Sequence, residues 1–207
     1  VGTRYHFEEG ESLKSGNTDH SDFFFDGSIG WTTNKISLHN AGTKYTAAIG
    51  KWINPLWGLR VGINTNTLKH SAPEVSVAGV DLRHNKTMVM AGARGELLLN
   101  PLNFFNGWRN KAGGHDFDLN FSAGAELGYL AKNDFGNGRF HNSYYGVTTA
   151  LQFLYRINNP GTYIYLEPRY LSTYYTAPYT GTKINHTVSD NMFSMNLGVR
   201  TYLTDPS

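Results

Sequence analysis

The chain has 207 residues, a net charge of +2, only 16% charged residues and no cysteine. The small net charge argues against nucleic acid as a partner, and the lack of cysteine excludes disulfides and thiolate metal sites. No run of about 18 apolar residues occurs, so the sequence contains no helical membrane span.

Eight segments alternate apolar and polar residues with a period of two, which predicts eight β-strands. The clearest segment runs from Asp116 to Leu130 and is about twice as long as an ordinary strand. The predicted strands cover residues 23–32, 44–53, 57–68, 87–99, 116–130, 144–156, 163–174 and 191–203. Each is long enough for the roughly 9–11 residues that a tilted transmembrane strand needs.

The connections between these strands differ in length according to their position. Long polar connections follow the odd-numbered strands, at 33–43, 69–86, 131–143 and 175–190. Short turns with proline follow two even-numbered strands, whereas 100–115 is a longer connection. This pattern predicts an all-β fold, an eight-stranded antiparallel up-and-down transmembrane β-barrel, because closure removes exposed sheet edges. We expect two parts: an N-terminal periplasmic segment at 1–22 and an outer-membrane barrel at 23–207.

The composition of the two strand faces indicates which face points inward. One face is apolar, as at Trp57, Leu59 and Val61, whereas the other combines glycine with charged residues, as at Gly58 and Arg60. Glycine weakens a strand, so a solvated surface has no reason to prefer it. The narrow lumen of an eight-stranded barrel does, because long side chains fit there only beside small ones. We therefore expect apolar residues to face lipid and polar residues to face the lumen.

The charged residues of the polar faces balance one another. Five are positive and five negative, as an enclosed site requires, because an unpaired buried charge is costly. The predicted structural network in the lumen consists of Asp26, Arg60, Arg94, Glu96, Asp118, Glu126, Arg156, Glu167, Arg169 and Arg200.

Aromatic residues gather near the predicted strand ends, where a membrane barrel carries interfacial girdles. These residues are Trp31, Tyr45, Trp57, Tyr129, Tyr145, Tyr155 and Tyr170. Three details of the strands depart from the simple pattern. Pro168 predicts a bulge, Met88 and Met90 on the polar face of their strand suggest a register shift, and Lys51 falls on the lipid face near its end.

Four segments resemble a known family. They are "GKWINPLWGLRVGI" at 50–63, "ELLLNPLNFFNGW" at 96–108, "FSAGAELGYL" at 121–130 and "LQFLYRINNPGTYIYLEPRYLSTYY" at 151–175. Together they look like the N-terminal barrel of OmpA-like outer-membrane proteins of the Bacteroidetes type. The resemblance implies a Gram-negative outer-membrane location, contact with outer-membrane lipid, a charged lumen and both termini in the periplasm. It often also implies a C-terminal peptidoglycan-binding domain. The 207 residues contain no such domain, so we carry no peptidoglycan contact over to any of them.

The sequence offers little catalytic chemistry. Five histidines, His39, His70, His84, His141 and His186, fall in the long connections; His141 has a serine nearby, at Ser143, but no third partner is evident. Nucleophilic catalysis needs a base held beside a nucleophile, with a third group to orient the base. We therefore predict no enzyme activity, no catalytic residue, no metal site and no cofactor.

The leading functional prediction is a structural anchor or scaffold whose lumen is plugged by side chains, with no large pore. We further expect Phe104, Phe105 and Trp108 of the 100–115 connection, and the segment 1–22, to contact other envelope proteins on the periplasmic side. Two alternatives remain at this point: a lipid-modifying enzyme or protease acting at the extracellular rim, and a soluble lipocalin-like binding barrel.

Overall fold

The computed structural model describes residues 23–33, 41–71, 85–105, 116–133, 143–158, 161–178 and 185–203. These residues form eight strands and one short helix. The elements are β1 (Phe23–Thr33), β2 (Gly42–Trp52), β3 (Trp57–Ser71), β4 (Asn85–Leu99), α1 (Pro101–Phe105), β5 (Phe117–Asn133), β6 (Ser143–Asn158), β7 (Thr162–Pro178) and β8 (Asn185–Tyr202). The helix α1 is too short to cross a bilayer, and no other helix occurs among the described residues.

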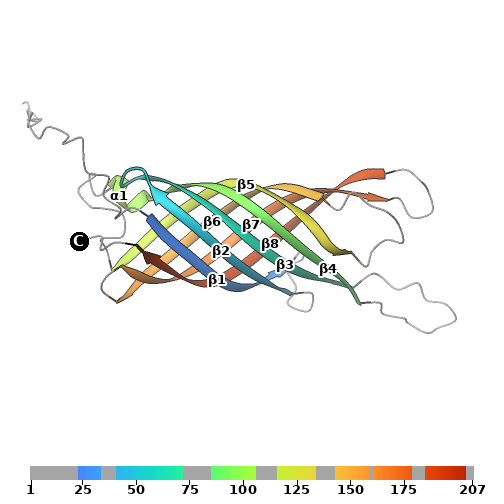
Figure 1. Ribbon diagram of the computed structural model, residues 1–207, viewed down its shortest axis with the longest axis horizontal. Helices are drawn as coiled ribbons and strands as arrows, with labels where there is room; N and C mark the ends of the chain where they lie inside the picture. The colour runs from blue at the N-terminus through green and yellow to red at the C-terminus, as the bar shows by residue number, and fades with distance from the viewer. Residues whose placement is uncertain are drawn as a thin grey trace, which may run out of the picture.

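The strands close into a single barrel of tilted strands (Figure 1). Each strand pairs antiparallel with its neighbours in the chain, and β8 closes on β1. If directly paired residues are followed once around the barrel from Phe23, the path returns to β1 at Thr33. The stagger from residue 23 to residue 33 is typical of closed barrels, whose strands tilt by about 35–45°. The all-β, eight-stranded antiparallel architecture predicted from the sequence is confirmed.

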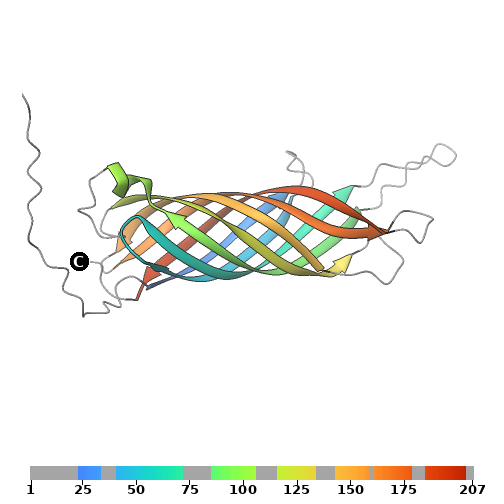
Figure 2. The same cartoon turned by 90° about the horizontal axis from the view of Figure 1, so that it is seen from above.

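The two ends of the barrel differ. At one end, which we call the turn end, β1 begins, β8 finishes and α1 lies beside the tight turns (Figure 1). At the opposite end, the loop end, the β3–β4 and β7–β8 pairs extend furthest along the barrel axis (Figure 2). The strands β1 and β2 have 11 residues each, whereas β7 and β8 have 17 and 18. The rim at the loop end is therefore uneven.

Asparagine side chains shape the connections at the turn end. Between β2 and β3, the Oδ1 atom of Asn54 accepts hydrogen bonds from the backbone N–H groups of Leu56 and Trp57, at 2.9 and 2.8 Å. Such a bond replaces a backbone contact and favours a turn. Asn100 acts similarly before α1, where its Oδ1 accepts from the N–H of Asn103 at 3.2 Å. Between β6 and β7, Gly161 adopts a left-handed conformation with φ of 61°, which glycine tolerates without strain.

Where side-chain burial is described, it follows the period read from the sequence, except at the end of β1, where Thr32 and Thr33 are both buried. In β2 the alternation is unbroken from Gly42 to Trp52. The polar or small face points into the barrel, and the apolar face points out, with Ile63 and Leu127 each 65% exposed. This polarity is opposite to that of a lipocalin-like barrel, whose apolar side chains line the interior, so the soluble alternative loses its support.

The bulge predicted at Pro168 is absent, whereas the register shift predicted near Met88 and Met90 is present. Pro168 causes no bulge: β7 keeps one register with β6 on both sides of it, and Pro168 itself lies opposite Met195 of β8. The proline removes a hydrogen-bond donor without adding a residue to the strand. A register shift does occur between Val89 and Met90, on the side of β4 that pairs with β5. The β3–β4 ladder continues past this point without a break.

Candidate functional site: the sealed interior of the barrel

The interior of the barrel is filled by three layers of side chains. An aromatic cluster lies at the turn end, a layer of paired charges occupies the middle, and a second apolar cluster lies toward the loop end. The inward side chains of these layers are almost all buried.

Arg60 of β3 is the hub of the central layer. Its Nε donates to Glu96 of β4 at 2.8 Å, and its Nη1 donates to Asp26 of β1 at 2.9 Å. Its Nη1 and Nη2 also donate to Glu167 of β7, each at 3.2 Å. Because β3 and β7 are four strands apart in an eight-stranded barrel, the Arg60–Glu167 pair joins opposite walls across the axis.

Glu96 is the second hub. Besides Arg60, its carboxylate accepts hydrogen bonds from Arg94 Nε at 3.0 Å and from Arg169 Nη1 at 2.5 Å. Arg169 also donates through Nε to Glu167 at 2.9 Å. Three guanidinium groups therefore share one carboxylate, and all of these side chains are at most 1% exposed. In such a site each charge depends on its partners, because a buried charge without a partner is strongly destabilising.

The network ends toward the turn end at Arg200 of β8. Its Nε and Nη2 donate to the two oxygens of Asp26, at 2.7 and 2.8 Å, in a bidentate pair. Its Nη2 also donates to Gln152 Oε1 at 2.8 Å, and Gln152 Nε2 donates to Glu167 at 2.7 Å. This amide closes a ring of hydrogen bonds through β1, β3, β6, β7 and β8. Charge-assisted bonds of this kind are stronger than neutral ones and hold their groups in fixed geometry.

The ten residues predicted for the lumen do not all join this ring. Asp26, Arg60, Arg94, Glu96, Glu167, Arg169 and Arg200 belong to the central charge network, of which that ring is one part, and all seven are buried. Asp118 lies nearer the turn end, where its Oδ1 accepts from Asn100 Nδ2 at 2.7 Å. Arg156 lies at the same end, half-buried, and donates to the hydroxyl of Tyr163 at 3.0 and 3.1 Å. Glu126 is fully buried toward the loop end and accepts from Tyr144 Oη at 2.8 Å.

The sequence reading missed one buried cation. Lys44 of β2 is 1% exposed, and its Nζ lies 3.4 Å from Ser194 Oγ. Lys44 lies between the outward residues Thr43 and Tyr45, so the alternation of β2 alone predicts that its side chain points into the lumen. The count of five cations against five carboxylates therefore omitted a sixth inward cation.

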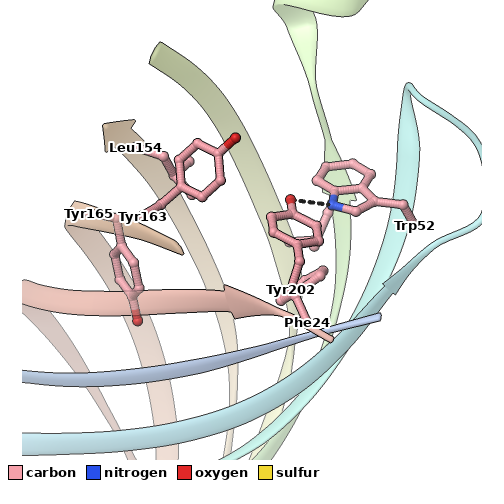
Figure 3. Close-up of a cluster of buried hydrophobic side chains, with 7 residues drawn as sticks. Phe24, Trp52, Leu154, Tyr163, Tyr165 and Tyr202 are labelled. Carbon is pink, nitrogen blue, oxygen red and sulfur yellow. Dashed lines mark hydrogen bonds between the residues drawn. The ribbon is translucent and has the colours of Figure 1, made fainter. Parts of the chain in front are cut away.

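Aromatic rings seal the turn end of the lumen (Figure 3). Trp52 Nε1 donates to Tyr202 Oη at 3.1 Å, and the Phe24 ring lies 5.7 Å from that of Tyr202. Tyr163 meets Tyr202 edge-on at 5.9 Å. The Arg200 guanidinium lies over the Phe24 ring at 3.9 Å, which joins this cluster to the charged layer through a cation–π contact.

Seven buried side chains form the cluster toward the loop end. They are Leu68, Met88, Met90, Leu130, Tyr144, Leu171 and Met192. The thioether side chains fill this irregular space because methionine adapts its shape to its neighbours. Met88 and Met90 thus belong to the lumen, as their position on the polar face indicated.

Inward glycines make room for these long side chains. A Cβ atom added to Gly50 would overlap the Phe24 ring, and one added to Gly124 would lie 2.9 Å from the Glu96 side chain. The glycine-rich faces are therefore needed to seat the aromatic cluster and the carboxylate hub.

The predicted interfacial aromatics all lie on the outward faces of their strands; Trp31 is half-buried because its ring packs against that of Phe193, 5.9 Å away. Trp57 and Tyr155 lie near the turn end. Tyr45, Tyr129 and Tyr145 lie at the loop-end side of their strands. Tyr170 is near the middle of β7, yet it pairs with Phe193 and so belongs to the same row as Trp31. Lys51 is exposed near the turn end, with its Nζ 4.7 Å from the Phe23 ring.

The short helix α1 is attached to the β2–β3 turn. Asn103 Nδ2 donates to the carbonyl oxygen of Pro55 at 2.7 Å. The backbone N–H of Asn100 donates to the carbonyl oxygen of Leu56 at 2.9 Å. Phe104 and Phe105 close this helix. Trp108, the third residue predicted to meet a partner, lies outside the described residues, as does the segment 1–22.

Among the described residues no group of three or more histidine, aspartate and glutamate side chains could hold a metal ion. His39, His84 and His141 lie outside the described residues. His70 and His186 lie near the loop end of β3 and β8.

Comparisons with known proteins support the fold. No family model matches the chain, and no curated protein matches its sequence. Several solved structures are similar, among them two outer-membrane proteins. Neisserial surface protein A (NspA) has a TM-score of 0.51 and 13% identity, over 87% of this chain and 97% of that one. The outer membrane protein OprG from Pseudomonas aeruginosa has a TM-score of 0.57 and 10% identity, over 88% and 97%. At these identities the likeness establishes a shared barrel fold.

Proposed function

We propose that this protein is a bacterial outer-membrane barrel that acts as a structural anchor in the cell envelope and conducts no solute. The polarity of the wall supports the location, because apolar side chains face outward between two sets of outward aromatic residues. The shared fold with outer-membrane barrels supports it too. We place both termini in the periplasm, since β1 begins and β8 finishes at the turn end.

One observation carries the proposal of a closed barrel. Side chains from opposite walls meet at hydrogen-bond distance on the barrel axis, as Arg60 and Glu167 do. Apolar clusters cover this layer on both sides. An ion entering the lumen would have to break several buried charge pairs at once. Eight strands leave an interior that side chains can fill completely, in contrast to the water-filled channel of larger porins.

Planar lipid bilayer recordings test the closed barrel. Purified protein should insert without producing stable conductance steps, and a known porin inserted under the same conditions serves as the positive control. A double variant, Arg60→Ala with Glu167→Ala, removes the pair that crosses the axis and should be the first to show openings. Stable large openings of the unaltered protein would refute a side-chain plug.

We also propose that the turn end meets other envelope proteins. The support is the attachment of α1 to the β2–β3 turn, which fixes the start of the 100–115 connection against the barrel. A photoreactive residue in place of Phe105 should crosslink an envelope protein in intact cells. The same residue in place of Tyr129, at the other end, is the control. The OmpA-like resemblance and a Bacteroidetes origin stay predictions, and so does the absence of enzyme activity.

A further inference from the structure

The outer wall of the barrel carries an apolar groove that crosses β1 to β5. Phe25 and Ile49 line one end of it, Leu127 lines the other, and Ala47, Gly95 and Ala125 are among the small residues between them. Its volume is about 780 Å³, within the range of small-molecule sites. Asp26 and Arg94 also border it, but their side chains point into the lumen and leave the groove apolar.

The chain itself does not need this space. Gly95 pairs directly with Ala125, and a Cβ atom added to Gly95 would meet nothing within 4 Å. The inward glycines behave differently: Gly50 and Gly124 have side chains pressed against them. Glycine weakens a strand and often marks a place where another molecule approaches the backbone closely. At Gly95 none of the described residues makes that approach.

The position of the groove along the barrel indicates what fills it. On β3, Val61 of the groove lies four residues from the outward Trp57, which is near the turn end. On β5, Ala125 lies four residues from the outward Tyr129, which is near the loop end. The groove therefore lies between the two sets of aromatic residues that mark the membrane surfaces. At that depth the surroundings are lipid hydrocarbon.

We propose that this groove holds one acyl chain of a phospholipid, bound for longer than the chains around the rest of the barrel. The inference rests on the proposed membrane location. Its apolar lining offers no hydrogen bond to a polar ligand, and its long path across five strands suits a flexible hydrocarbon chain. The groove continues the lipid-facing surface, so a chain can enter it sideways without leaving the bilayer.

Photolabelling tests the proposal in liposomes. The probe is a phosphatidylcholine with a diazirine in one acyl chain, and labelled peptides are mapped by mass spectrometry. Ala125→Leu fills the groove. Ala123→Leu is the matched control, because it adds the same side chain to the lipid-facing side of the same strand, next to Leu97 and Thr149 rather than in the groove. Adducts should concentrate on the groove residues of β1 to β5, Ala125→Leu should remove this excess, and Ala123→Leu should keep it.

Three results would refute the proposal that the groove holds an acyl chain. They are equal labelling around the whole barrel, equal labelling of the two leucine variants, and a disulfide-linked dimer of an Ala125→Cys variant, which would mean that a second copy fills the space. The chain has no cysteine of its own, so any disulfide comes from the introduced thiol. A failure of the proposed membrane location has a different signature, namely no labelling of any strand.

Discussion

Replacing Glu96 with glutamine tests the charge network at its most connected point. The change keeps the shape of the side chain and removes its charge. Three guanidinium groups, those of Arg60, Arg94 and Arg169, lose the carboxylate that they share. Removing one partner from a buried ion pair costs about 3–5 kcal/mol. We expect Glu96→Gln to lower the free energy of unfolding by about this amount. The amide oxygen can still accept a hydrogen bond, but the amide carries no negative charge and places its N–H donors beside cations.

Glu126→Gln is the matched control. Glu126 is as deeply buried, on the adjacent strand β5, but its described hydrogen bond comes from the neutral hydroxyl of Tyr144. The glutamine oxygen can still accept from the Tyr144 hydroxyl, so this variant loses at most about 1 kcal/mol, the contribution of one hydrogen bond, and should be clearly more stable than Glu96→Gln. Urea titration of the refolded barrel in detergent, followed by the gel mobility of folded and unfolded forms, measures both values. If the two variants unfold at the same urea concentration, shared pairing at Glu96 contributes nothing special and the network account fails.

Three further predictions concern packing and turns. Gly50→Leu should destabilise the barrel by about 1–3 kcal/mol because the new side chain meets the Phe24 ring, whereas Gly95→Leu, which meets open space, should refold normally in the same urea assay. Trp52→Phe should cost about 1 kcal/mol through loss of the hydrogen bond to Tyr202, and an unchanged urea midpoint would contradict a role for that bond. Asn54→Ala should slow refolding and cost about 1 kcal/mol, since two backbone N–H groups lose their acceptor; stopped-flow fluorescence of refolding would show whether the turn matters.

The sequence alone predicted the strands well wherever one face of the strand is apolar. The predicted start of β3 at Trp57 and end of β4 at Leu99 agree with the structure. At the loop end the predicted strands were too short: β8 begins at Asn185, six residues before the predicted Asn191. The strands β3, β5 and β7 likewise run on to Ser71, Asn133 and Pro178. Beyond the apolar band both faces of a strand become polar, so the period of two disappears although the hydrogen-bonded ladder continues.

The pairing of the lumen charges was less predictable than their burial. Alternation places Arg60 and Glu96 on the inner face, but it contains no information about which residues meet across the barrel. That depends on the stagger of the strands, which brings Arg60 to Glu167 on the opposite wall. The same limit explains why Asp118 and Glu126 were grouped with the network: they share its face but lie at other heights along the axis. The inward orientation of Lys44 could have been predicted from its position in the alternation of β2, but Lys44 was left out of the count of inward charges.

Thiol labelling of two adjacent positions tests most directly whether the apolar outer face of the barrel is in contact with lipid. The chain has no cysteine, so single replacements are unambiguous. In β5, Phe121 is 38% exposed on the outer wall, whereas Ser122 is fully buried in the lumen. In liposomes, Phe121→Cys should react with a membrane-soluble maleimide, and Ser122→Cys should react with neither that reagent nor a water-soluble one. Rapid reaction of Phe121→Cys with the water-soluble reagent alone would mean that this wall is in water, and would contradict a membrane barrel.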